Sequence, residues 1–189
     1  MKTETIEKIL NFLKEKEDKR LPINWKIFLA KENIIRKLEN HPDGTLYIHH
    51  GYSDLRNTNI KRLPKDFYTD DSLTLSGCKQ LTELPDKLHV GGSLYLNDSS
   101  ITELPKKLFV GGSLDLNKTN ITKLPDNLFV DGWLDLENCK QITELPKKLY
   151  VGGNLFIRNT SLVNKYTEKE IRDIVASTGG EIIKRIIMY

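Results

Sequence analysis

A short unit that recurs along the chain constrains its fold more than any other feature. The dipeptide Leu-Pro begins at residues 63, 84, 104, 124 and 145, so its spacings are 21, 20, 20 and 21 residues. The intervening sequence also repeats, as LPDKLHVGGSLYLNDSSITE and then LPKKLFVGGSLDLNKTNITK. Self-similarity with a period of 20 to 21 residues is typical of a solenoid, in which successive turns stack on one another.

Each part of the unit predicts a local conformation. The alternation Leu-x-Leu, as in Leu94-Tyr95-Leu96, predicts a strand of about three residues with two side chains inward and one outward. Glycine pairs such as Gly91-Gly92 precede this strand, where the chain must turn tightly and where a positive φ would be tolerated. The proline forbids a regular helix in the return segment, which we expect to be extended or 3₁₀.

Stacking the turns about 4.8 Å apart pairs the strands in parallel and creates one apolar column, because a single turn buries too little to fold alone. The predicted inward set also includes the leucine of each Leu-Pro. Its other members are Leu73, Leu75, Leu94, Leu96, Leu114, Leu116, Leu134, Leu136, Leu155 and Ile157, followed by Leu81, Ile101, Ile121, Ile142 and Leu162.

Residues 134–136 (Leu-Asp-Leu) and 142–146 (Ile-Thr-Glu-Leu-Pro) resemble the leucine-rich repeat family, in its short bacterial type with the unit L-x-L-x-x-N-x-L-T-x-L-P. The resemblance covers roughly residues 50–165. It implies a repeat solenoid of the kind found in invasion-type effectors of pathogenic bacteria, with related Gly-Gly versions in bacterial and phage proteins. The family's buried Asn is replaced here by small side chains that we expect to bond a neighbouring backbone amide. These are Thr58, Cys78, Ser99, Thr119, Cys139 and Thr160.

The predicted fold is an α/β-type solenoid of about six turns over residues 45–164, with short parallel strands and irregular, non-α return segments. Residues 1–44 are predicted to form a helical N-terminal cap, whose second helix uses Leu38 and stops before His41. Residues 165–189 are predicted to form a short helical C-terminal cap that opens with a capping box at Thr167 and Glu170. Partner binding or membrane-surface attachment by the amphipathic N-terminal helices remains an alternative to capping.

Composition excludes several classes. Lys and Arg number 29 against 26 Asp and Glu, and a net charge of +3 argues against a dedicated nucleic-acid coat. No apolar run is long enough to span a bilayer and no signal-peptide core follows the first residues, so we expect a cytoplasmic location, in the source cell or in a host that it enters. Cys78 and Cys139 lie three turns apart, about 14 Å, which is too far for a disulfide.

No motif for catalysis, phosphate binding or metal chelation occurs, so we expect a non-enzymatic protein with no cofactor and no metal site. The adjacent His49 and His50 cannot readily chelate one metal, because neighbouring strand residues point to opposite faces. Cys78 and Cys139 are expected to be buried and inert.

The outward side chains single out one candidate surface. Trp133 interrupts a column of serines, and exposed Trp is a favoured interface anchor. Asp115 and Asp135 should be neighbours in the next column, where like charges are modestly destabilising unless a basic partner or a cation offsets them. The candidate partner-binding residues are Tyr95, Asp115, Trp133, Asp135, Glu137 and Phe156. The alternative interpretations are an ordinary solvated acidic surface and a metal site.

We therefore expect an inhibitor-like or effector-like module that binds a partner protein, such as one with a basic surface, through the concave strand face. An alternative is a nucleic-acid-binding protein that uses basic rows on the opposite side. Those rows are Lys87, Lys106, Lys107, Lys147 and Lys148. Their alternation with acidic residues is more typical of a solvated surface.

Overall fold

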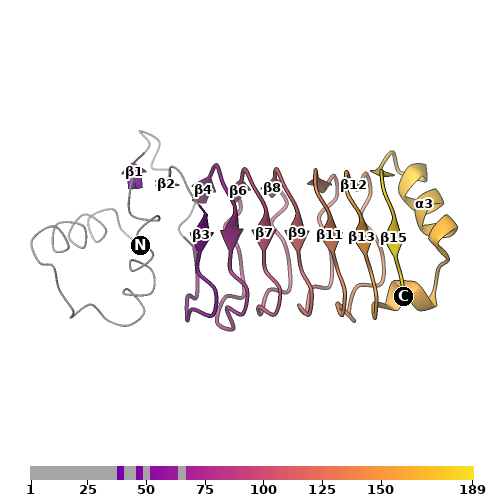
Figure 1. Cartoon of the computed structure of the whole chain (residues 1–189), viewed down its shortest axis with the longest axis horizontal. Helices are drawn as coiled ribbons and strands as arrows, with labels where there is room; N and C mark the ends of the chain where they lie inside the picture. Colours follow the sequence, from indigo (N-terminus) through magenta and orange to yellow (C-terminus); the bar gives the residue numbers. More distant parts are fainter. Residues whose placement is uncertain (1–37, 41–45, 49–51, 64–66) are drawn as a thin grey trace, which may run out of the picture.

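The computed structural model describes residues 38–40, 46–48, 52–63 and 67–189. Over this part the chain winds as a parallel-strand β-solenoid, with two sheets running along its length (Figure 1). The smaller sheet has seven strands in the described residues. They are β3 (Ser53–Asp54), β5 (Leu73–Thr74), β7 (Leu94–Tyr95), β9 (Leu114–Asp115), β11 (Leu134–Asp135), β13 (Leu155–Phe156) and β15 (Ile186–Ile187).

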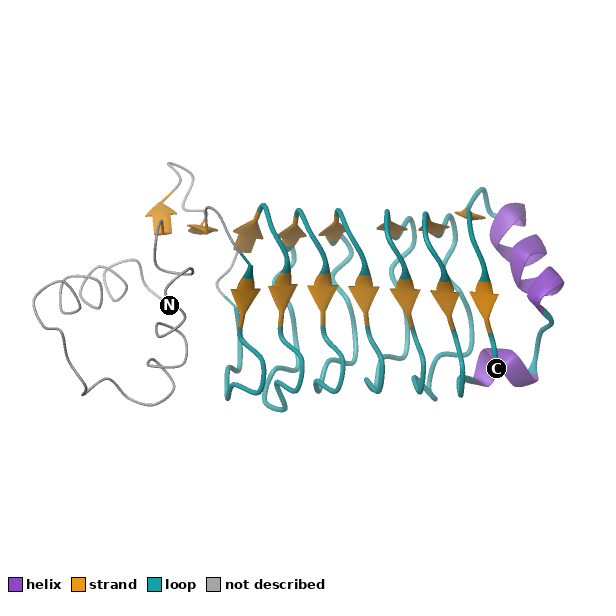
Figure 2. Ribbon diagram, in the orientation of Figure 1, coloured by secondary structure: helices purple, strands orange, loops and turns teal. Residues whose placement is uncertain are grey.

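The larger sheet has eight strands in the same described part, and Figure 2 shows the two rows of short arrows. Its strands are β1 (Leu38–Asn40), β2 (Leu46–Ile48), β4 (Phe67–Thr69), β6 (His89–Val90), β8 (Phe109–Val110), β10 (Phe129–Val130), β12 (Tyr150–Val151) and β14 (Glu181–Ile182). All neighbours are parallel except β1, which pairs antiparallel with β2. Leu38, predicted to lie in a helix, therefore lies in a strand, because its backbone pairs with that of Ile48.

The predicted Leu-x-Leu strands form the smaller sheet. Leu94 pairs with Leu114, and Leu114 with Leu134, so equivalent residues of successive units lie side by side. This register is the one that the 20- to 21-residue repeat predicts. It confirms short parallel strands stacked as a solenoid.

The larger sheet was not predicted. Each return segment was expected to be extended or 3₁₀ and to form no regular element, but after the Leu-Pro turn it pairs as a second strand, for example Phe109–Val110 in β8. Leu88 and Val90 flank an outward side chain, and both are fully buried, so the segment obeys the same alternation as Leu-x-Leu. The segment before each proline matches the prediction more closely, since its one ladder contact in the described residues is an isolated bridge between Glu103 and Lys123.

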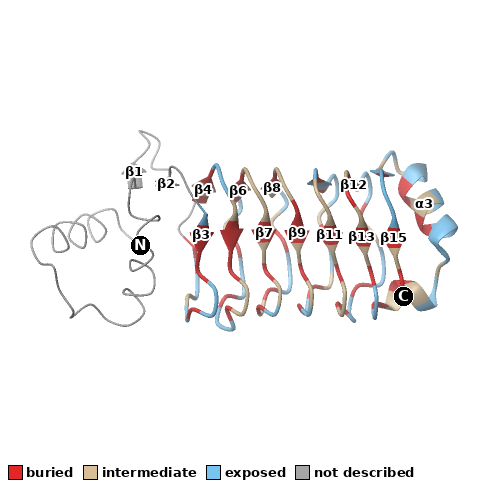
Figure 3. Ribbon diagram, in the orientation of Figure 1, coloured by how far each residue is buried: buried red, intermediate tan, exposed pale blue. Residues whose placement is uncertain are grey.

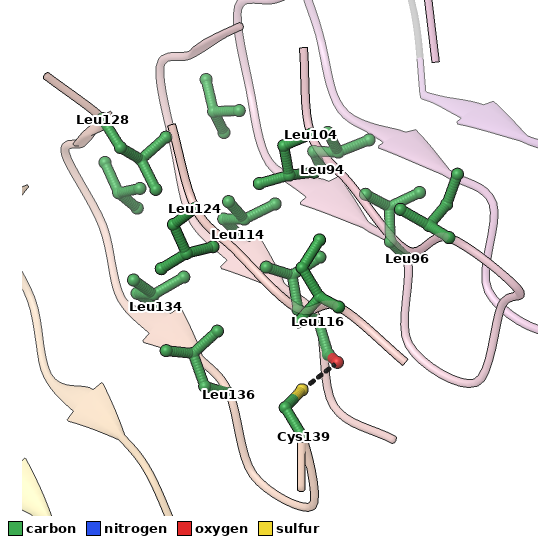
Figure 4. Packing of buried hydrophobic residues seen from close by; sticks show 14 of the residues in the cluster. Leu94, Leu96, Leu104, Leu114, Leu116, Leu124, Leu128, Leu134, Leu136 and Cys139 are labelled. Atoms are coloured by element: carbon green, nitrogen blue, oxygen red, sulfur yellow. Dashed lines mark hydrogen bonds between the residues drawn. The ribbon is translucent and has the colours of Figure 1, made fainter. Parts of the chain in front are cut away.

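The core is one apolar column between the two sheets, shown in red in Figure 3 and as packed leucines in Figure 4. Every residue predicted inward on the Leu-x-Leu strands is buried, as are the five predicted aliphatic residues after them. Of the Leu-Pro leucines, Leu145 is only partly buried, and the other four are buried. The second strand adds valines and leucines to the same column, including Val110, Val130 and Val151.

The glycine pairs are required for a different reason from the one expected. Among the described glycines, positive φ occurs at Gly77 and Gly179, and not in the pairs that precede the Leu-x-Leu strands. A Cβ on Gly112 would lie 2.7 Å from Ser93 Oγ and 2.8 Å from the carbonyl carbon of Gly92. Neighbouring turns therefore approach too closely at this corner for a side chain, and the Gly112 amide donates to the Gly92 carbonyl at 2.8 Å.

The column of small buried side chains closes the turn after each Leu-x-Leu strand, but it bonds carbonyls and not amides. Thr119 Oγ1 donates to the Leu116 carbonyl at 2.7 Å, and Cys139 Sγ, from the next turn, contacts the same carbonyl at 3.0 Å (Figure 4). A small donor satisfies this buried oxygen from within its own turn or across to the next. Ser99 is the exception, since its buried hydroxyl contacts no polar atom in the described part of the chain.

The C-terminal end continues both sheets. A 3₁₀ helix, η1 (Ser161–Asn164), precedes helix α3 (Glu168–Ser177), and Thr167 forms the predicted capping box with Glu170. Beyond the helix, β14 and β15 pair with β12 and β13, so residues 165–189 add one strand to each sheet. Apart from Leu38, the predicted N-terminal helices lie outside the described residues, and the domain boundaries remain predictions. In the described ranges, no helix has the length and apolar character needed to cross a membrane.

Candidate functional site

The six candidate residues gather on the outer face of the smaller sheet, and we call them the acidic-aromatic patch. They are Tyr95, Asp115, Trp133, Asp135, Glu137 and Phe156. Tyr95 pairs with Asp115, Asp115 with Asp135, and Asp135 with Phe156, so four of them form one continuous column across β7, β9, β11 and β13. The parallel register produces this column, because it aligns equivalent positions of consecutive units.

Trp133 joins the two aromatic ends of that column. Its ring centroid lies 6.3 Å from that of Tyr95, tilted by 55°, and 6.3 Å from that of Phe156, at 90°. Tyr95 and Phe156 stand three strands apart with the two aspartates between them. The indole therefore lies alongside Asp115 and Asp135, while the rings of Tyr95 and Phe156 flank the two aspartates at the ends of the column.

A ladder of serine hydroxyls holds the backbone that carries Trp133. Ser93 Oγ accepts from the Ser113 amide at 3.0 Å, and Ser113 Oγ accepts from the Trp133 amide at 3.1 Å. These hydroxyls extend the parallel ladder by one bond on each strand. Trp133 occupies the end of this serine series, so its ring projects where the preceding units have only a hydroxymethyl group.

The backbone holds both aspartate side chains by an equivalent hydrogen bond. The Asn117 amide donates to Asp115 Oδ1 at 2.9 Å, and the Glu137 amide donates to Asp135 Oδ1 at 2.7 Å. Each carboxylate is thus fixed by the backbone of the residue two positions later. The Asn117 side-chain amide lies 3.5 Å from Asp135 Oδ2, which is a long contact.

The surroundings of Asp115 and Asp135 disfavour the ionised form of both carboxyl groups. Burial, and then the negative charges of Asp135 and Glu137, raise the pKa of Asp115 to about 6, against the effect of the Asn117 amide. Burial also raises the pKa of Asp135, although its hydrogen bonds and Arg158 oppose the shift. Arg158 Nε lies 3.4 Å from Glu137 Oε1, so the nearest guanidinium pairs with Glu137 and not with either aspartate.

No group of three or more His, Cys, Asp or Glu side chains with a ligating arrangement occurs among the described residues. His49 and His50 lie outside those residues.

The five lysines of the alternative prediction lie on the corner that follows the prolines, and all five are exposed. Lys106 and Lys147 border a shallow hollow of about 640 Å³, which Asp126 and Glu144 also line. The acidic side chains interrupt the basic row, as the alternation of signs indicates.

Sequence reasoning missed an aromatic stripe on the outer face of the larger sheet. The rings of Tyr68, His89 and Phe109 stack in series, with centroids 4.3 and 4.4 Å apart, and Phe129 stacks on Tyr150 at 4.7 Å. The signal was present, since the residue between the Leu and the Val of each return strand is aromatic or His. It was missed because the segment was not recognised as a strand.

The stripe is interrupted between Phe109 and Phe129, where Asp131 replaces the first glycine of a pair. A Cβ at the equivalent Gly111 would collide with the Gly91 carbonyl. The Gly111 amide bonds the Val90 carbonyl at 2.9 Å, whereas within the described chain the Asp131 amide makes no such bond. The pairing of β10 with β8 is reduced to Val130 against Val110, because the Asp131 Cβ keeps the turns apart.

Comparison with family models, with curated proteins and with solved structures finds no match to this chain.

Proposed function

We propose that the chain is a non-enzymatic module that binds a partner protein through the acidic-aromatic patch, in the manner of an inhibitor or an effector. The observation that supports this most is the position of Trp133, whose ring borders two half-buried aspartates between Tyr95 and Phe156. Trp and Tyr side chains are typical of interface anchors, and neither aspartate forms an ion pair within the described residues. A partner with a basic surface would supply the missing counter-charge.

The leucine-rich repeat interpretation belongs to the same proposal. Short parallel strands, repeated every 20 to 21 residues, present their outward columns on one rigid face, and repeat solenoids use such faces for binding. On this interpretation helix α3 closes the C-terminal end of the solenoid. We do not propose nucleic-acid binding by the basic row, because Asp126 and Glu144 lie on the same surface as its lysines.

The test is partner capture with a double variant, Trp133→Ala with Asp135→Ala. The wild-type chain, immobilised and exposed to source-cell and host lysates, should retain a partner that mass spectrometry identifies and that the double variant no longer retains. The melting temperature of the variant should not fall, because both side chains lie on the outer face. A matched control, Lys106→Ala with Lys107→Ala on the opposite corner, should retain the partner. Equal retention by the double variant would reject the patch as the binding surface.

A further inference from the structure

The column that contains Asp115 and Asp135 also contains a third aspartate, and that one has a cation. Arg56 donates from Nε to Asp54 Oδ1 at 3.1 Å and from Nη2 to Asp54 Oδ2 at 3.0 Å. The Arg56 backbone amide also donates to Asp54 Oδ1 at 3.0 Å. The carboxylate is therefore fixed by the backbone two positions later and neutralised by a bidentate guanidinium.

The backbone part of this arrangement recurs at Asp115 and Asp135, and the arginine part does not. Both carboxylates accept the amide two positions later on Oδ1, as Asp54 does. The residues at the position of Arg56 are Asn117 and Glu137, which bring no positive charge. Within the described ranges, neither aspartate forms an ion pair, so the chain contains two copies of a guanidinium site from which the guanidinium is missing.

We propose that the acidic-aromatic patch binds an arginine side chain of its partner, and that the guanidinium occupies at Asp115 and Asp135 the place that Arg56 occupies at Asp54. The inference rests on the proposed function and names the chemistry that the partner must carry. Two features beyond charge favour it, namely the orientation of the carboxylates and the three rings beside them.

The carboxylate orientation favours arginine over lysine. At Asp54 the guanidinium bonds both oxygens of the carboxylate, although Oδ1 also accepts the Arg56 amide. Asp115 and Asp135 have the same amide bond on Oδ1, so their oxygens are held in the arrangement that accepts Arg56 at Asp54. A planar guanidinium with five donors can bond both oxygens at once, whereas an ammonium group acts as a point charge.

The rings favour the same ligand. Tyr95, Trp133 and Phe156 border the carboxylates, and a guanidinium stacks on an aromatic face while its edge bonds an acceptor. At Asp54 the corresponding outward neighbour is Tyr52, so that site also has an aromatic side chain in the column that Trp133 occupies. The patch thus combines a charge acceptor with a stacking surface.

A peptide titration tests the inference directly. The full chain, labelled with ¹⁵N, is titrated with acetylated and amidated Gly-Arg-Gly, Gly-Lys-Gly and Gly-citrulline-Gly while the Trp133 indole N–H and the Asn117 and Glu137 amides are followed by NMR. The arginine peptide should give saturating shifts at all three groups, the lysine peptide should bind at least fivefold more weakly, and the citrulline peptide should give no saturable shift. A lysine peptide that binds within fivefold of the arginine peptide would overturn the inference, as would an arginine peptide without saturable shifts at Trp133.

Two variants make the result specific. Asp135→Asn keeps the amide bond to Oδ1 and should weaken the arginine peptide at least fivefold. The control Asp98→Asn removes an exposed carboxylate paired with Lys79 and should leave binding unchanged. Unchanged binding by Asp135→Asn would contradict the site.

A third variant fills the site from within the chain. Asn117→Arg places an arginine two residues after Asp115, as Arg56 follows Asp54, and should abolish peptide binding without lowering the melting temperature. The capture experiment separates this inference from the proposed function. If the Asn117→Arg chain retains the partner and the Trp133→Ala and Asp135→Ala double variant loses it, the proposed function stands and the arginine site is refuted. Loss of the partner in both variants, with peptide selectivity for arginine, supports both.

Discussion

Asp115 on β9 and Asp135 on β11 lie directly opposite each other on adjacent parallel strands, half-buried beside the indole of Trp133. Like charges in this position repel each other and destabilise the folded state. The two residues stay adjacent because backbone pairing of the strands fixes their register. The melting behaviour, the titration of the carboxyl groups and the binding behaviour of the surface all depend on this pair.

The first prediction concerns stability against pH. The pKa of Asp115 is about 6 in the folded chain against an ordinary value of 3.8, so the folded state binds this proton more tightly than the unfolded state. The destabilisation from this group is therefore fully present above pH 6 and is relieved as the pH falls from 6 towards 4. Asp115→Asn should raise the free energy of unfolding at pH 7.5 and have little effect near pH 4.

The expected size of that effect follows from the same values. The shift corresponds to at most about 3 kcal/mol, and screening at this partly exposed group reduces the expected gain to about 1 kcal/mol. Thermal and urea unfolding at both pH values measure it, with Asp98→Asn as the matched surface control. A gain that is equal at pH 7.5 and pH 4 would show that charge is not the cause.

The second prediction is that the indole of Trp133 keeps water away from the Asp115 carboxylate. Trp133→Ala should admit water to the carboxylate and lower the pKa of Asp115 towards its ordinary value, because burial is the main cause of the shift. A ¹³C carboxyl titration by NMR measures this change. Tyr52→Ala, in the same outward column at the first strand, should leave the pKa of Asp115 unchanged. If Trp133→Ala also leaves it near 6, the strands and not the ring exclude the water.

The third prediction concerns the interruption in the larger sheet. Asp131→Gly removes the Cβ that keeps β10 away from β8, and it should restore backbone bonds such as the one that the Gly111 amide makes to Val90. Two recovered bonds, offset by the entropy of glycine, should stabilise the chain by about 1 kcal/mol. Hydrogen exchange of the Phe129 and residue 131 amides should slow accordingly.

The reverse substitution is the matched control for the third prediction. Gly111→Asp places a side chain where the Gly91 carbonyl already lies, and overpacking at this corner should destabilise the chain by about 1–3 kcal/mol. Exchange rates at Phe129 that do not change in Asp131→Gly would mean that another feature opens the sheet.

The fourth prediction concerns the two cysteines. Cys78 and Cys139 are fully buried, so both thiols are shielded from solvent, and burial also raises the pKa of the Cys139 thiol. Ellman's reagent should modify both thiols only at the rate at which the chain unfolds, and guanidinium should accelerate the two reactions together. Rapid modification of either thiol in the native chain would contradict its place in the core.

A structural feature can be predicted from the sequence when the residues that cause it are close together in the chain. Leu94 and Leu96 share one face of a strand because side chains alternate, which the sequence shows directly, and the repeat aligns them with Leu114 and Leu116. The strand around Phe109 was missed because it is two residues long and follows a proline turn, so its single alternation resembles a loop. The glycine pairs were recognised but explained by the wrong cause, since the carbonyl that excludes a side chain belongs to the preceding turn.

The sequence by itself determined the solenoid, the inward column of the Leu-x-Leu strands and the grouping of Asp115 with Asp135, because period and alternation are properties of the chain. The tertiary structure alone decided that the Trp133 ring reaches both Tyr95 and Phe156, and that burial raises the pKa of Asp115. It also decided that Arg56 neutralises Asp54 while no equivalent cation reaches the other two aspartates within the described residues. These outcomes depend on side-chain directions and on exclusion of water by neighbouring turns, which no stretch of sequence specifies by itself.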